Sequence, residues 1–311
     1  MNPTLLTSTA LATFRACPRK YRNRYVLRLA RARKATPLRF GGAFHLGLEM
    51  RQREGVLYDP IETATAGYDC RPDWADPVDW AVERETLRQL LAGHFWRYEQ
   101  DNIEYVAVEQ SFEVPLVNPG SGRRNRKFAL AGKIDGIVRL ADGRLAVLEF
   151  KTAGEDIDPS SEYWPRLRCD GQISMYVLAA RALGYDVATV LYDVTRKPTI
   201  RLRKNETPQE YSQRLFEDIN ARPDYYYQRR EVPRLEDELA EFRCELWQQA
   251  QSIREAVKHD RWYRSVSRLT CAYCEFSELC FNAVRIDPAC PPSGFEILAD
   301  PHPELASEEA D

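Results

Sequence analysis

Two carboxylates and one amine are predicted to lie close together near the middle of the chain. Asp135 lies in one predicted β-strand, and Glu149 and Lys151 lie in the next. Because side chains alternate along a strand, Glu149 and Lys151 point to one face and Phe150 points to the other. The two strands are neighbours in a hairpin, so Asp135 can lie beside Glu149. The spacing therefore predicts two acids and one amine in one place.

This set of side chains suits hydrolysis of a phosphodiester bond. Two carboxylates can bind Mg²⁺, which prefers oxygen ligands and keeps several waters. The ion lowers the pKa of a bound water and stabilises the leaving oxygen, while a nearby lysine neutralises developing charge. The segment around Glu149 is otherwise apolar, and a buried charge is costly unless a metal or a partner compensates it. The alternative is a structural ion pair between Lys151 and Glu149 within the hairpin.

Three of the eight cysteines form a second cluster, in which Cys271, Cys274 and Cys280 have the spacing C-x2-C-x5-C. The chain looks intracellular, where disulfides are disfavoured, so clustered cysteines indicate metal or redox chemistry. One C-x2-C could be half of a zinc site, but no second such pair and no nearby histidine pair completes it. A fourth ligand must therefore come from a distant part of the chain. The scattered cysteines are interpreted as ordinary thiols, namely Cys70, Cys169, Cys244 and Cys290.

The N-terminal segment carries a run of basic residues with no acid among them, although the net charge of the chain is −3. Phe14, Tyr21 and Tyr25 are interleaved with this run, a composition typical of a surface that binds phosphate groups. The alternative is a solvated helix face. The residues predicted to bind DNA are Arg15, Arg19, Lys20, Arg22, Arg24 and Arg28.

Helices and strands are predicted to alternate around these residues. Apolar residues recur at helical intervals in residues 7–33, 43–54, 80–100, 172–183, 208–220 and 235–259. Strand patterns cover residues 105–109, 111–117, 129–140, 144–150 and 187–193, with a further candidate at 199–203. Pro18 marks a start or a break in the first helix, His45 falls in the first turn of the second, and residues 141–143 form a hairpin turn. This order predicts an α/β core with helical wrapping.

The central motif resembles that of the PD-(D/E)XK nucleases, with Asp135 followed by Glu149-Phe150-Lys151. Ile134 replaces the usual proline, a departure common in the RecB-like branch of that superfamily. His45 is similar to the upstream histidine of this branch, Gln172 and Tyr176 to its Q-x-x-x-Y motif, and Glu109, more weakly, to an acid on an earlier strand. The resemblance implies that the metal site consists of His45, Asp135, Glu149 and Phe150. It implies that the catalytic residues are Asp135, Glu149, Lys151, Gln172 and Tyr176.

Cys17 resembles the N-terminal cysteine of an iron–sulfur subgroup, which includes AddB-type helicase–nucleases and CRISPR-associated RecB-like exonucleases. The resemblance implies a 4Fe–4S cluster held by Cys17, Cys271, Cys274 and Cys280. Four thiolates are the usual ligands of such a cluster, but they also suit zinc, which remains the alternative. The cluster would close a long loop and hold the N-terminal helix against the C-terminal segment.

The resemblance implies a restriction-endonuclease-like core, in which helices flank a central mixed sheet, with an added four-cysteine cluster. Residues 1–285 would form one RecB-like domain, with a helical insertion at about 50–102 and a cysteine region made by 7–34 and 262–285. Residues 286–311 form an acidic, proline-rich segment that is expected to be flexible.

The expected function is a Mg²⁺- or Mn²⁺-dependent DNA nuclease. The resemblance implies an exonuclease acting on free or single-stranded ends in DNA repair, recombination or phage DNA processing. The chain has no G-x-x-x-x-G-K-[ST] motif, so any helicase or recombinase would be a separate partner. The alternatives are a silent nucleic-acid-binding or interaction module of the same fold and a zinc-binding interaction protein. No stretch approaches the roughly 20 apolar residues of a membrane span, and no secretory signal is recognisable, so a cytoplasmic protein is expected.

Overall fold

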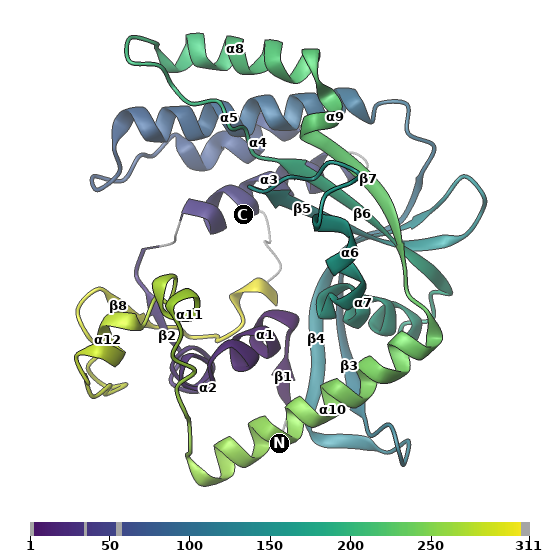
Figure 1. The fold of residues 1–311 in the computed structure, drawn as a ribbon, viewed down its shortest axis with the longest axis vertical. Coiled ribbons are helices and arrows are strands. Elements are labelled where there is room, and N and C mark those ends of the chain that lie inside the picture. The colour runs from purple at the N-terminus through teal and green to yellow at the C-terminus, as the bar shows by residue number, and fades with distance from the viewer. Residues whose placement is uncertain (1–2, 34–35, 54–57, 306–311) are drawn as a thin grey trace.

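The computed structural model describes residues 3–33, 36–53 and 58–305. A mixed six-stranded sheet lies at its centre, in the order β1-β4-β5-β6-β7, with β3 paired to β4 (Figure 1). The α/β class and the mixed central sheet flanked by helices are confirmed. The strands of this sheet are β1 (Thr4–Leu6), β3 (Glu104–Val117), β4 (Arg124–Arg139), β5 (Leu145–Ala153), β6 (Val187–Arg196) and β7 (Tyr227–Pro233).

The long strand β4 has two different partners along one edge. Residues 128–130 pair in parallel with β1, and residues 136–139 pair in antiparallel fashion with β5. β3 pairs along the opposite edge. The first edge therefore has an unpaired stretch at residues 131–135, and Asp135 is the last residue of this stretch. Asp135 is thus placed where β4 and β5 separate.

The β4–β5 hairpin confirms the turn predicted at residues 141–143. The N–H of Leu140 donates to the carbonyl oxygen of Arg144 at 2.9 Å, and the N–H of Gly143 donates to that of Leu140 at 2.8 Å. Gly143 has a φ of 86°, in the left-handed region that favours glycine. The turn fixes the register of the two strands that carry the central motif.

Helices cover both faces of the sheet (Figure 1). The sheet separates the apolar core into two parts, one on each face. Val147 packs into the first core, whereas its neighbours on β5, Leu148 and Phe150, pack into the second. In the part of the chain described, no helix is long and apolar enough to cross a membrane. The first core contains α1 (Ser8–Ala16), α7 (Gly171–Ala182) and α10 (Glu236–His259), and the second contains α3 (Thr36–Gln52), α4 (Pro60–Thr65), α5 (Pro77–Arg97) and α8 (Pro208–Ala221).

The helix α3 begins earlier than predicted, so the expected start at residue 43 is wrong. A proline and two adjacent glycines suggested a loop, but proline is tolerated in the first turn of a helix. Phe40, Phe44 and Leu48 are all buried, and their spacing forms one stripe that begins before residue 43. His45 consequently lies in the middle of the helix rather than in its first turn. Residue 54, the expected end, lies outside the described residues.

The N-terminal segment is helical with the start predicted at Pro18, but the helical prediction for residues 29–31 is wrong. α1 ends before Cys17, whose backbone is extended, with φ of −166° and ψ of 112°. Pro18 begins the short helix α2 (Pro18–Tyr21), and a π-helical turn, η1 (Arg22–Val26), follows. β2 (Leu29–Arg31) then pairs with β8 (Phe295–Ile297) in a two-stranded sheet. Proline has no N–H to continue a helix, and the exchange of backbone hydrogen bonds with β8 overrides the helical pattern beyond residue 28.

The C-terminal segment, expected to be flexible from residue 286, is folded against the N-terminal segment as far as it is described. Besides the β2–β8 pair, the ring of Phe295 stacks on Phe276 with centroids 5.8 Å apart. The ring of His302 stacks on that of Tyr25 at 5.1 Å, and His302 is buried. These contacts bury apolar side chains of the segment, which its acidic, proline-rich composition did not predict. Residues 306–311 lie outside the described residues.

Two further differences concern short strands. Residues 199–203, a candidate strand, contain no strand in the structure. β7, which was not predicted, pairs with β6 over residues 227–233. Its sequence is largely polar because it lies at the end of the sheet order, where only one neighbour pairs with it. Within the insertion at about 50–102, α4 and the 3-10 turn η2 (Ala66–Tyr68) precede α5.

Candidate active site

The separation of β4 and β5 places Asp135 against the backbone of the next strand. The N–H of Phe150 donates to Asp135 Oδ2 at 2.7 Å, in place of the ladder hydrogen bond that would have continued the hairpin. On the other side, His45 Nδ1 of α3 lies 3.4 Å from Asp135 Oδ1. The two upstream residues of the predicted site are therefore in direct contact.

The strand β3 is distorted directly opposite this point. Register pairs on either side place Glu109 across from Asp135, and Glu109 has a φ of 50°, which is unusual for a residue other than glycine. The Glu109 carboxylate is mostly buried and forms an ion pair with Lys133. Burial and the nearby Asp135 raise its pKa. The weak sequence match at Glu109 is therefore placed beside the site.

Glu149 is the most deeply buried acid of the site. It is 1% exposed, and one of its oxygens, Oε1, forms an ion pair with Lys151. This contact confirms that the two side chains lie on one face of β5. The other oxygen, Oε2, is buried and has no hydrogen-bond partner within the described chain. A buried carboxylate oxygen without a partner costs folding free energy, and a bound cation would provide the missing interaction.

The two acids of the motif are held in different electrostatic states. Burial, together with the nearby Asp135, raises the pKa of Glu149 to about 7, although Lys151 opposes the shift. Burial would also raise the pKa of Asp135, but His45, Lys151 and the N–H of Phe150 outweigh it and lower the pKa. Burial lowers the pKa of Lys151, yet the two acids outweigh it, so its pKa is raised and the amine stays charged.

α7 presents the two remaining residues of the predicted site. The Asp170 side chain caps this helix and accepts the N–H groups of Gln172 and Ile173. One turn later, Gln172 Nε2 donates to the Tyr176 hydroxyl at 2.9 Å, so both side chains lie on one face. Burial and the charges of the two central acids raise the pKa of Tyr176 well above its usual value, which keeps the phenol protonated.

Gly132 allows Tyr176 to approach the sheet. A Cβ atom at this position would lie 2.6 Å from the ring of Phe112 and 3.3 Å from that of Tyr176. The two rings meet edge to face, with centroids 5.8 Å apart. Gly132 was visible in the sequence, but only the position of Phe112 on the neighbouring strand reveals its function.

Arg234 also belongs to the support of the site, and sequence reasoning missed it. This arginine is 4% exposed and follows directly after β7. Its Nε donates to Ser174 Oγ at 3.0 Å, and its Nη2 donates to the carbonyl oxygen of Leu167. Burial lowers its pKa. Arg234 therefore ties the loop before α7, and α7 itself, to the end of the sheet, although no motif distinguishes it in the sequence.

No tight cluster of metal ligands is present among the described residues. In that part of the chain, no group of three or more His, Cys, Asp or Glu side chains is arranged to hold an ion. Instead each central acid contacts a cationic or titratable group of the chain, Asp135 with His45 and Glu149 with Lys151. The residue types still fit a divalent cation, because Glu149 Oε2 is buried without a partner and lies on the strand that neighbours Asp135.

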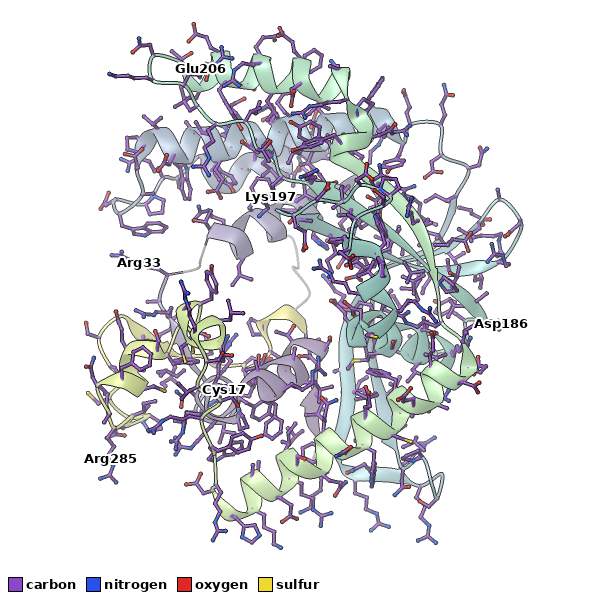
Figure 2. The ribbon with its side chains drawn as sticks, in the orientation of Figure 1. Cys17, Arg33, Asp186, Lys197, Glu206 and Arg285 are labelled. Atoms are coloured by element: carbon purple, nitrogen blue, oxygen red, sulfur yellow. The ribbon has the colours of Figure 1, made fainter. Side chains whose placement is uncertain are left out.

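The four cysteines of the predicted cluster line one cavity of about 320 Å³. Figure 2 shows Cys17 where the N-terminal helices meet residues 262–285, which carry α11 (Arg268–Ala272) and α12 (Ser277–Phe281). Burial raises the pKa of the Cys274 thiol, and Cys280 and Cys17 add to the shift. The cavity brings the four thiols together, but the geometry does not form a ligand set for a single ion. The four other cysteines are exposed.

The basic run of the N-terminal segment is not one free face. Arg19 and Arg22 bond to the C-terminal segment, through the Trp262 carbonyl oxygen at 3.2 Å and Asp260 at 3.4 Å. Arg28 likewise donates to a C-terminal carbonyl, Lys20 lines the cysteine cavity, and Arg24 lies over the ring of Tyr25. Arg15 is one of the six residues predicted to bind DNA. It lines a cavity that Lys151 and Gln172 of the candidate site also line.

Comparison with known families gives a match over most of the chain. A family model described as the PD-(D/E)XK nuclease superfamily matches residues 6–281, which is most of the chain. The chain therefore belongs to the PD-(D/E)XK nuclease superfamily. Members of this superfamily are usually metal-dependent nucleases, and the fold implies a nucleic-acid substrate. The match does not distinguish the iron–sulfur subgroup.

Fourteen chains of known structure also match. One, described as "Crystal structure of SSO0001", is 15% identical, and the match covers 92% of this chain and 89% of that one with a TM-score of 0.37. At this identity and TM-score the likeness carries no argument about function. No protein among the curated sequences matches.

Proposed function

We propose that the protein is a Mg²⁺- or Mn²⁺-dependent deoxyribonuclease that hydrolyses phosphodiester bonds at free or single-stranded DNA ends. The observation that carries the proposal is the buried Glu149, whose Oε2 lacks a partner while its Oε1 contacts Lys151. A purely structural ion pair would not require an acid with one unsatisfied oxygen on the strand that neighbours Asp135. Superfamily membership supports the reaction class.

The divalent ion would be held by His45, Asp135, Glu149 and Phe150. Because a phenyl ring has no donor atom, Phe150 would contribute its main-chain carbonyl oxygen. When bound, the ion supplies a more acidic water and stabilises negative charge on phosphate oxygens. His45 and Asp135 are already in contact, so the chain positions two of the four residues through α3 and β4.

The other side chains of the site act on the phosphate directly. Lys151 remains protonated beside the buried acid and can neutralise charge that develops on the phosphoryl oxygens. Tyr176 stays protonated and Gln172 donates to its oxygen, so the phenol proton is free to point toward the substrate. α7 and its cap fix the direction of both groups.

Three finer assignments form part of the same proposal. The four cysteines around the 320 Å³ cavity would hold a 4Fe–4S cluster, with zinc as the alternative. Cleavage would proceed from ends, in repair, recombination or phage DNA processing. The nuclease would act alone or with a separate helicase or recombinase, because the chain has no P-loop motif of its own.

Cleavage of end-labelled DNA tests the proposal. Wild-type protein should degrade single-stranded DNA only when Mg²⁺ or Mn²⁺ is added, and Asp135→Asn, Glu149→Gln and Lys151→Met should each reduce the rate by at least about a hundredfold. Lys127→Met is the matched control, because Lys127 lies on the same strand as Asp135 but is exposed. Degradation by all three variants at the wild-type rate would exclude this site, and a protein that binds DNA but never cuts it would indicate the silent module.

A further inference from the structure

A groove of about 340 Å³ lies where the end of β3 meets α7 and α10, near the tip of the β3–β4 hairpin (Figure 1). All of its lining residues are apolar except Arg181 on α7 and Arg243 on α10. None of them belongs to the candidate active site, so the proposed chemistry does not account for the groove. We call it the β3–α10 groove. Its apolar walls include Val114, Leu116, Val117, Leu130, Leu178 and Leu246.

The groove is open because β3 is an edge strand. β3 pairs with β4 only, and its outer edge has no partner strand within the described chain. Leu116 and Leu246 form the floor and are each 2% exposed, whereas Val117 at the mouth is 41% exposed. An apolar side chain that enters from solvent would therefore bury both itself and part of Val117. Pro115 also lines the groove and has no N–H, so an incoming segment would be held by its side chains rather than as an added strand.

Cations without an ion pair surround the mouth of the groove. Arg243 is exposed and forms no ion pair with any described residue. Across the mouth, Arg124 on β4 is the register partner of Val117, and Arg123 and Arg126 lie beside it in the chain. These three arginines are also exposed and, in the described part of the chain, have no ion pair. The groove therefore combines an apolar floor with a positive rim.

We propose that the β3–α10 groove docks a segment of a partner protein in which acidic residues lie next to bulky apolar side chains. The apolar side chains would displace water from the floor, and the carboxylates would pair with the arginines of the rim. A planar guanidinium suits this pairing because it binds a carboxylate through two parallel hydrogen bonds. Arg181 can take part as well, since its ion pair with Glu236 is exposed and contributes little. This proposal does not depend on the nuclease function proposed above.

The lining of the groove favours a peptide over a nucleic acid. A phosphate backbone would be attracted to the rim, but it has no apolar side chain to fill the floor. Surfaces that bind single strands usually add aromatic side chains on which bases stack, and no aromatic residue of the described chain lines this groove. A peptide that is both acidic and apolar complements the floor and the rim together.

Fluorescence anisotropy with labelled peptides tests the proposal on the full-length protein. The peptides combine several aspartates with leucine, isoleucine or phenylalanine in varied order. At least one should bind saturably, with one peptide per chain, and more weakly at high salt because the rim is exposed. The same peptide with serines in place of its apolar residues, or with lysines in place of its aspartates, should bind at least about tenfold more weakly. If no peptide of the set binds saturably, the proposal is wrong.

Substitutions at the mouth locate the binding site. Arg243→Ala and Arg124→Ala should each weaken peptide binding by about three- to fivefold, the loss expected for one exposed ion pair. Val117→Asp should weaken it more, because it places a like charge and a polar group at the mouth. Arg254→Ala is the matched control, because Arg254 is also exposed on α10 but does not line the groove. All four variants should keep the wild-type Tm, since each changes an exposed side chain.

Three results would overturn the proposal. Wild-type affinity in all three mouth variants would place the peptide elsewhere. If the same variants lose affinity for single-stranded DNA without divalent ions, and no peptide binds, the rim is a nucleic-acid surface. A wild type that sediments as a dimer and a Val117→Asp variant that sediments as a monomer would assign the groove to a second copy of the chain.

A last variant separates the groove from the proposed nuclease site. Glu149→Gln should bind the peptide with wild-type affinity whether or not the wild type cuts DNA, because Glu149 does not line the groove. A loss of peptide affinity in Glu149→Gln would place the peptide in the active site and contradict the proposal.

Discussion

At the scale of single residues, Glu149 shows the conflict between stability and the proposed activity most clearly. Its side chain is 1% exposed, and its Oε2 has no hydrogen-bond partner in the described chain. Burial raises its pKa to about 7, which means that the folded protein disfavours the charged form. Such an arrangement costs folding free energy and is typical of residues retained for function.

Replacing this acid should separate stability from activity. In the absence of divalent ions and above about pH 7, Glu149→Gln should stabilise the fold by about 1–2 kcal/mol, because the raised pKa of Glu149 shows that burying its charge costs more than its contact with Lys151 returns. Thermal unfolding with and without Mg²⁺ measures this. Added ion should raise the Tm of the wild type and leave that of Glu149→Gln nearly unchanged, since a ligand stabilises only a state that binds it. A variant that is less stable than the wild type, or equally stabilised by Mg²⁺, would contradict this account.

The residues of the site were largely predictable from the sequence, and their supports were not. Alternation along one strand was enough to place Glu149 and Lys151 together, and a helical spacing was enough for Gln172 and Tyr176. Gly132 and Arg234 were missed because their functions depend on residues far away in the sequence. No local pattern distinguishes a glycine that admits a ring from one in a turn, or a buried arginine from an exposed one.

At the scale of elements, the site depends on how β4, β5, α3 and α7 are joined. The turn signal at residues 141–143 and the apolar strands on either side predicted the hairpin correctly, because register there is set locally. The start of α3 was mispredicted because proline and glycine usually end helices. β1, β2, β7 and β8 were missed because each is short or polar and is defined by a distant partner strand.

Arg234 allows a test at this scale, because it connects β7 to α7. Arg234→Met should lower kcat at least tenfold and destabilise the fold by about 2–3 kcal/mol, since the Leu167 carbonyl and Ser174 lose a buried donor. Arg234→Lys, which keeps one charged donor nitrogen, should recover part of the lost kcat and part of the lost stability. Nuclear magnetic resonance of the Tyr176 ring would report the displacement of α7.

Arg168→Met is the control, because Arg168 lies just before α7 in the 3-10 turn η3 (Leu167–Cys169), is 70% exposed, and pairs with Glu238. It should change neither kcat nor the free energy of unfolding appreciably. If Arg234→Met lost stability but kept full kcat, Arg234 would support the fold alone and would not position the residues of α7.

At the scale of the whole molecule, the two ends of the chain are held together. Three contacts join the N-terminal segment to the last third of the chain. They are the strand pair β2–β8, the hydrogen bond from Arg19 to the Trp262 carbonyl oxygen, and the ion pair of Arg22 with Asp260. The four cysteines line a cavity at the same junction. The family resemblance implied a cysteine region made by 7–34 and 262–285. The folded C-terminal segment was not predicted, because its contacts depend on apolar residues scattered in an acidic, proline-rich stretch.

The cysteine junction should bind metal as a unit. Protein purified without oxygen should contain about four irons per chain, the content of a cluster held by four thiolates. Cys17→Ser should lose that iron and lower the Tm, because the N-terminal segment loses one tether and a long loop reopens. Iron analysis and visible absorbance measure the iron content, and thermal unfolding measures the Tm. Cys244→Ser, an exposed cysteine on α10, is the control and should retain all the iron.

Two results would contradict the cluster. If the protein is colourless and contains zinc, the four cysteines bind zinc in place of an iron–sulfur cluster, and the junction between the two ends still stands. Full metal content in Cys17→Ser would remove Cys17 from the ligand set, and with it the proposed link between the two ends.

The central claim is that Asp135, Glu149 and Lys151 hydrolyse DNA with a divalent ion, and the most direct measurement is degradation of end-labelled single-stranded DNA. Wild-type protein should degrade this DNA with Mg²⁺ or Mn²⁺ and not with a chelator. Asp135→Asn should lose at least about a hundredfold in rate and retain DNA binding. Lys127→Met should cut at the wild-type rate. Metal-independent cleavage, or cleavage by Asp135→Asn at the wild-type rate, would contradict the account.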